Sequence, residues 1–104
     1  MENKQYELTF LPLFEQDLNE AVDYIANTLN SPQAALNLVD EVEKVIFERL
    51  KNPAGYAPFL TLKKRPHDYY TIKVRNFTIF YVLIENTMEI RRILYSKRDF
   101  DKLI

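Results

Sequence analysis

Residues 69–98 hold three strand-like runs separated by short turns, and this stretch most constrains the fold. The middle run, residues 77–84 (FTIFYVLI), is apolar on both faces, which is typical of a central strand. The flanking runs, residues 70–75 and 88–96, alternate apolar and polar side chains as half-buried strands do. Arg75-Asn76 and Asn86-Thr87 suit two-residue hairpin loops, with Asn tolerating a positive φ. The sequence therefore predicts three adjacent antiparallel strands.

Hairpin register decides which side chains share a face of this sheet. The first loop places Val74 opposite Phe77 and Lys73 opposite Thr78. The second places Phe80 opposite Ile93 and Thr78 opposite Tyr95. One predicted face, suited to helices, then holds Ile72, Val74, Phe77, Ile79, Tyr81, Leu83, Met88, Ile90 and Leu94, with Arg92 as an outlier. The second predicted face holds Thr71, Lys73, Arg75, Thr78, Phe80, Val82, Arg91, Ile93 and Tyr95.

Two amphipathic helices precede the strands. Apolar residues recur at helical spacing from residue 13 to 29, after a proline that suits the first turn. Asn30-Ser31-Pro32 interrupts the pattern, and a second apolar stripe continues to about residue 51, with Ser31 as a possible N-cap. Two such helices joined by a short turn are expected to form an antiparallel hairpin that covers one face of the sheet.

The remaining segments complete the fold prediction. Residues 6–11 form a first strand, residues 59–64 (FLTLKK) a short edge strand, and residues 97–104 a turn of helix. The predicted fold class is therefore α+β, with two layers: a helical hairpin on one face of a four- to five-stranded, mainly antiparallel sheet in the order β-α-α-β-β-β. At 104 residues we expect a single domain over residues 1–104.

Charge is divided unevenly along the chain although the net charge is only −1. Residues 1–50 carry ten acids and three bases, and residues 51–104 carry eleven bases and five acids, so the halves sum to −7 and +6. Such a distribution steers charged partners toward one surface. Basic residues near the strands and the turn before them could contact a target or a nucleic acid: Lys63, Lys64, Arg65, Arg91 and Lys97.

Several function classes are excluded by composition. The chain has no cysteine and a single histidine, so thiolate chemistry, disulfides and a multi-histidine metal site are not available. No glycine-rich phosphate loop or Ser-His-Asp candidate is present. We expect no metal and no cofactor. No apolar run is long enough to span a membrane, and the first residues lack a signal-peptide pattern, so we expect a cytoplasmic protein.

The second predicted face carries a patch of exposed apolar side chains, formed by Phe80, Val82, Ile84 and Ile93. Monomers seldom leave a contiguous apolar patch of this kind open to water. A partner protein is the expected cover.

The order of elements and residues 69–99 (YYTIKVRNFTIFYVLIENTMEIRRILYSKRD) together resemble the RelE/ParE toxin superfamily. The shared features are a strand led by tyrosine, a tight hairpin, an aromatic-rich strand, and an Ile-x-Arg-Ile-Leu strand that ends in a basic pair and Asp. The resemblance implies the toxin of a type II toxin-antitoxin pair, often described as plasmid stabilisation. It also implies a cognate antitoxin that would cover the apolar face, and higher-order toxin-antitoxin complexes.

Members of the superfamily divide by target, and the site residues expected here differ accordingly. RelE-like toxins cleave mRNA on the ribosome, and a chain of that type would use Lys73, Arg75, Tyr95 and Arg98 as catalytic residues. ParE-like toxins inhibit DNA gyrase without cutting RNA.

This chain departs from the RelE-like pattern at three positions. Thr71 and Thr78 replace expected cations, and the chain ends at Ile104 where a functional tyrosine would stand. Losing fixed cations and a general acid or base removes orders of magnitude in rate. The prediction is therefore a ParE-like growth inhibitor, with a RelE-like endoribonuclease and a non-toxic relative that only binds a partner as alternatives.

Overall fold

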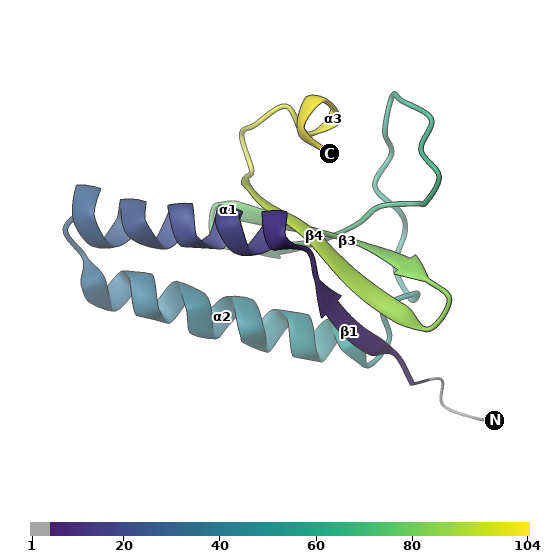
Figure 1. The fold of residues 1–104 in the computed structure, drawn as a ribbon, viewed down its shortest axis with the longest axis horizontal. Helices are drawn as coiled ribbons and strands as arrows, with labels where there is room; N and C mark the ends of the chain where they lie inside the picture. The colour runs from purple at the N-terminus through teal and green to yellow at the C-terminus, as the bar shows by residue number, and fades with distance from the viewer. Residues whose placement is uncertain (1–4) are drawn as a thin grey trace.

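The computed structural model describes residues 5–104 and has the predicted two-layer α+β architecture (Figure 1). Helices α1 and α2 lie side by side as a hairpin, and α3 lies apart from them near the loop that precedes β2. The elements in chain order are β1 (Glu7–Phe10), α1 (Pro12–Asp23), η1 (Tyr24–Thr28), α2 (Pro32–Leu50), β2 (Tyr70–Val74), β3 (Phe77–Ile84), β4 (Thr87–Tyr95) and α3 (Phe100–Leu103).

Both long helices begin at a proline, as predicted, but their ends differ from the prediction in two ways. The first helix does not stay α-helical to residue 29: α1 ends at Asp23 and continues as the wider π-helical turn η1, in which the Leu29 N–H donates to the Tyr24 carbonyl at 3.0 Å. Ser31 occupies the N-cap position of α2, but its side chain makes no capping hydrogen bond. The wider turn is where the exposed Tyr24 stands.

The four strands are arranged in the order β1-β4-β3-β2, with β1 parallel to β4 and the other pairs antiparallel. The predicted register of the first hairpin is confirmed, because Val74 pairs with Phe77 and Lys73 pairs with Thr78. The left-handed backbone conformation falls on Arg75 (φ 51°) and not on Asn76, where it was expected.

The second hairpin turns one residue earlier than predicted. Its loop is Glu85-Asn86, so Ile84 pairs with Thr87 and Leu83 with Met88. The left-handed position is Glu85 (φ 56°). Relative to the predicted pairing, both strands are displaced by one residue, so before the bulge each side chain keeps its predicted face. Met88 and Ile90 are buried on the helix side as expected.

A β-bulge changes the last part of β4. Tyr81 pairs with Ile90 but Phe80 pairs with Arg92, so Arg91 is an extra residue in the strand. An extra residue moves every later side chain to the opposite face. The predicted pairs of Ile93 with Phe80 and of Tyr95 with Thr78 are therefore wrong, and Ile93 and Tyr95 instead oppose Ile79 and Phe77.

The main core lies between the helical hairpin and one face of the sheet. Phe14 of α1 and Leu38, Val42 and Ile46 of α2 are buried there. Their partners on the strands are Ile72, Val74, Ile79, Tyr81, Met88, Ile90 and Ile93. Ile93 thus belongs to this core, and the prediction that it lies on the opposite apolar face is wrong.

The second face is not open, and the expectation that a partner protein must cover it is also wrong. Phe80 and Val82 have no exposed surface, and Leu94 and Tyr69 complete the same buried cluster. The cover comes from Phe59 in the loop before β2 and from Phe100, Leu103 and Ile104 at the C-terminal end, and Ile84 of β3 packs against the same cluster. The Phe80 ring centroid lies 4.8 Å from that of Phe100 and 5.6 Å from that of Phe59.

Residues 59–64 do not form the predicted edge strand. Phe59 makes an isolated bridge to Tyr69, with its N–H 2.6 Å from the Tyr69 carbonyl, and the chain then leaves the sheet as a loop. The predicted helical turn of the tail is confirmed as α3.

Candidate interaction site

The edge of β4 contacts α1 through one charged pair. β1 ends opposite Ile90, so the following residues of β4 have no strand beside them on that edge. Asp17 of α1 lies there and accepts hydrogen bonds from Arg92 Nε at 2.7 Å, Arg92 Nη2 at 2.9 Å and the Ile93 N–H at 3.2 Å. The hydrogen bond to Asp17 raises the pKa of Arg92. The bulge takes Arg92 off the predicted helix face, where it was an outlier, and places it opposite Phe80, from where it binds both Asp17 and the Leu103 carbonyl.

Beside this pair, α1 and the end of β4 enclose a groove of about 560 Å³. Its apolar side chains come from helix and sheet alike, and two partly exposed tyrosines, Tyr24 (54% exposed) and Tyr95 (43% exposed), also line it. The Tyr95 ring packs edge-on against Phe77, with centroids 5.5 Å apart. The lining residues are Asp17, Glu20, Ala21, Tyr24, Phe77, Arg92, Ile93, Leu94, Tyr95 and Arg98.

The groove carries opposite charges on its two walls. Asp17 and Glu20 belong to α1, whereas Arg98 follows β4. Arg92 is neutralised by Asp17, but within residues 5–104 the Arg98 guanidinium makes no ion pair. An apolar groove with one unpaired cation suits a peptide segment that presents apolar side chains and a carboxylate.

The four residues expected to cleave RNA do not form one site. Tyr95 and Arg98 line the groove, but Lys73 pairs with Thr78 on the other face of the sheet, because the bulge has moved Tyr95. Arg75 forms an ion pair with Glu41 of α2 and donates to the Ala34 carbonyl at 3.2 Å. Lys73 therefore lies on one face of the sheet, Tyr95 and Arg98 line the groove on the other side, and Arg75 is bound to α2.

Thr78, one of the positions where a cation was missing, is a structural residue. It is buried, and its hydroxyl lies 2.9 Å from that of Ser96. The Thr78 side chain is therefore held inside the protein on the same face as Lys73.

The five basic residues expected to contact a target divide into two groups. Lys63, Lys64 and Lys97 are exposed. Arg65 and Arg91 are partly buried and paired within the chain, Arg65 with Asp101 at 3.2 Å and Arg91 with Glu89 at 2.8 Å.

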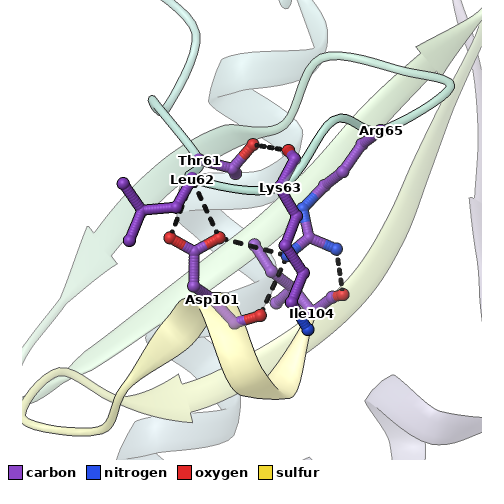
Figure 2. A network of polar contacts seen from close by, with 6 residues as sticks. All are labelled: Thr61, Leu62, Lys63, Arg65, Asp101 and Ile104. Carbon is purple, nitrogen blue, oxygen red and sulfur yellow. Dashed lines mark hydrogen bonds and ion pairs between the residues drawn. The ribbon is translucent and has the colours of Figure 1, made fainter.

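Arg65 and Asp101 join the loop before β2 to the C-terminal helix (Figure 2). Asp101 accepts the Leu62 N–H through both carboxylate oxygens, at 2.9 and 3.1 Å. Arg65 also donates to the carbonyls of Asp101 and Ile104. The backbone hydrogen bond from Leu62, aided by Arg65, lowers the pKa of Asp101. The loop and α3 therefore form one connected cover over Phe80.

A second polar network was not predicted from the sequence. Arg49, at the end of α2, donates to the Thr71 carbonyl and to the Tyr81 hydroxyl, each at 3.0 Å, and stacks on the Tyr56 ring. The Tyr81 hydroxyl donates to the Pro53 carbonyl at 2.7 Å, and burial raises the pKa of Tyr81. The Thr71 carbonyl faces the outer edge of β2, so Arg49 protects this edge from pairing with another strand.

Two other kinds of feature are absent from residues 5–104. No group of three or more His, Asp or Glu side chains there is arranged to hold a metal ion. No helix in that range is long and apolar enough to cross a membrane.

Two solved structures share the fold of this chain. The chain is similar to one in the chromosomal ParDE TA system from P. aeruginosa, with a TM-score of 0.70 and 18% identity over 90% of this chain and 99% of that one. It is also similar to one in the RelB-RelE antitoxin-toxin complex from Methanococcus jannaschii, with a TM-score of 0.55 and 22% identity over 92% and 99% of the two chains. At these identities the likeness shows the fold alone. No curated protein sequence gives a significant match.

A family profile identifies the family to which the chain belongs. The profile described as "ParE toxin of type II toxin-antitoxin system, parDE" matches residues 8–100, nearly the whole chain. The chain therefore belongs to the ParE toxin family and is a toxin of a type II toxin-antitoxin system. The resemblance noted in the sequence is confirmed, including its closer relation to the ParE-like branch.

Proposed function

We infer that this toxin arrests growth in the cytoplasm by binding a protein target, DNA gyrase, and not by cleaving RNA. The observation that carries this inference is the separation of Lys73 from Tyr95 on opposite faces of the sheet. Of the four residues expected to act on one phosphate, only Tyr95 and Arg98 line the same groove, so a phosphate bound there would lack the cation that Lys73 was expected to supply. Arg75 is held by Glu41 and does not supply the missing cation.

The groove beside α1 is the proposed seat of the antitoxin. Tyr24 and Tyr95 are large, partly exposed side chains of the type that dominates binding energy at protein interfaces. The groove floor is apolar, and Arg98 offers a charge at its edge. Both solved relatives come from toxin-antitoxin systems, which supports an antitoxin as partner. Phe80, Val82 and Ile84 belong to the cluster that the chain itself covers and lie outside this proposed seat, whereas Ile93 lines the groove.

The mode of action is tested with purified toxin in two assays run side by side. In a DNA gyrase supercoiling assay, we expect inhibition that the antitoxin reverses. In a translating extract, we expect no mRNA cleavage at low toxin-to-ribosome ratios. Cleavage that disappears in the Lys73→Ala, Arg98→Ala double variant would show instead that the protein is an endoribonuclease.

The antitoxin site is tested by truncating the two tyrosines. Tyr24→Ala and Tyr95→Ala should each weaken antitoxin binding by about tenfold or more, since truncation of such interface aromatics typically costs about 2 kcal/mol. Phe47→Ala on α2 is the matched control, because Phe47 is 56% exposed, close to the 54% of Tyr24, and lies outside the groove. Equal affinity of all three variants for the antitoxin in titration calorimetry would contradict the groove as the antitoxin site.

A further inference from the structure

The loop between α2 and β2 exposes two leucines more fully than any other large apolar side chain among residues 5–104. Leu60 is 89% exposed and Leu62 is 94% exposed, whereas the other exposed large apolar side chains lie between 41% and 61%. We call residues 59–64 the leucine loop. Exposed apolar side chains that lie close together are a common feature of interaction surfaces.

The chain holds this loop in place and so keeps both leucines out of its own core. On one side, Phe59 is anchored by its bridge to Tyr69 and packs on the Phe80 ring. On the other, the Leu62 N–H is bound by the Asp101 carboxylate, which Arg65 also contacts. Figure 2 shows Leu62 on the side of Asp101 that faces away from Arg65. The loop conformation is therefore ordered before binding, which reduces the entropic cost of association.

The charges next to the leucines indicate the chemistry of the partner. Lys63 and Lys64 follow directly, and both are exposed. Neither forms an ion pair within residues 5–104. Leucine has no π face on which a base could stack, so an apolar pair beside two cations fits a protein better than a single-stranded nucleic acid. The complementary surface is an apolar depression bordered by carboxylates.

We propose that the leucine loop is the surface through which this toxin binds its protein target, with Leu60 and Leu62 entering an apolar depression and Lys63 and Lys64 facing acidic side chains at its rim. This inference rests on the proposed function. The loop shares no residue with the groove assigned to the antitoxin. The two surfaces can therefore be separated by mutation, and the antitoxin would neutralise the toxin without contacting the leucines.

The test compares the double variant Leu60→Ser, Leu62→Ser with the wild-type chain. Each leucine buried at an interface accounts for about tenfold in affinity or more. We therefore expect the double variant to inhibit purified DNA gyrase at least about a hundredfold less well and to lose growth arrest when expressed without antitoxin. Its antitoxin affinity and its circular dichroism spectrum should not change. The matched control, Leu29→Ser with Leu36→Ser, removes two other exposed leucines and should remain toxic.

The outcomes separate this inference from the proposed function. Growth arrest by the wild type and equal arrest by the leucine variant would overturn the inference alone. No growth arrest by the wild type would overturn the proposed function and the inference with it. A Lys63→Ala, Lys64→Ala variant should lose only part of the activity, in a salt-dependent manner. If that variant were inactive while the leucine variant stayed toxic, the loop would be a nucleic-acid contact and the proposal would be wrong.

Discussion

Replacing Phe80 by alanine tests whether the second face of the sheet is covered in solution as it is in the structure. The Phe80 side chain has no exposed surface, and its ring contacts those of Phe59, Tyr69 and Phe100 at centroid distances of 5.6, 6.4 and 4.8 Å. Truncating a buried phenylalanine removes its transfer free energy and leaves a cavity, which together cost about 3–5 kcal/mol. If the face were open, as the sequence pattern alone suggested, the same change would cost under about 1 kcal/mol.

The free energy of unfolding, measured by urea denaturation of the wild type and of Phe80→Ala, distinguishes these cases. Domains of this size are stable by only about 5–15 kcal/mol, so Phe80→Ala could leave too little folded protein to measure. Phe80→Leu then serves as a milder change, with an expected loss of about 1–1.5 kcal/mol. Phe47→Ala is the control at an exposed position and should change stability by about 0.5 kcal/mol or less. A similar small loss for Phe80→Ala and Phe47→Ala would refute the intramolecular cover.

Two further predictions concern buried polar groups. Asp17→Asn should destabilise the protein by about 2 kcal/mol, because Asp17 binds the guanidinium of Arg92 and both side chains are largely buried. Glu41→Gln, at the more exposed pair with Arg75, should cost under about 1 kcal/mol. Equal losses for the two variants in thermal unfolding would contradict the greater contribution of the buried pair. Burial raises the folded-state pKa of Tyr81 above its unfolded value of about 10. This tyrosine therefore stabilises the fold below pH 10 and loses that contribution as the pH rises through its folded pKa. Ultraviolet titration should show one tyrosine that ionises at higher pH than the others, and Tyr81→Phe should remove it.

The local patterns predicted most of the fold because each depends on neighbouring residues. The apolar stripes identified α1 and α2, and Arg75-Asn76 fixed the register of β2 and β3. In the same way, the alternation in residues 70–75 correctly assigned Ile72 and Val74 to the helix side.

The bulge at Arg91 could not be predicted in this way, and it altered the candidate site. No glycine or proline marks it, because Arg91 is an ordinary residue in a continuous run of strand-forming side chains. The bulge places Tyr95 in the groove and away from Lys73, so the residues of the predicted catalytic group are separated. The groove itself also depends on the π-helical turn at Tyr24, for which the apolar stripe gives no signal.

The cover over Phe80 was missed for a different physical reason. Its members are distant in sequence: Phe59 comes from the leucine loop, and Phe100 and Leu103 come from α3. Periodicity can assign a side chain to a face but does not show which distant segment packs on that face. The charged link between Arg65 and Asp101 brings the two segments together, and both residues look like ordinary surface charges in the sequence.

The central claim, that this ParE-family toxin acts by binding and not by RNA cleavage, is tested most directly by titrating purified toxin into a DNA gyrase supercoiling assay. We predict dose-dependent inhibition that an equimolar amount of the antitoxin relieves. Gyrase that stays fully active at a large excess of toxin, together with mRNA cleaved in a translating extract by the same preparation, would contradict the claim.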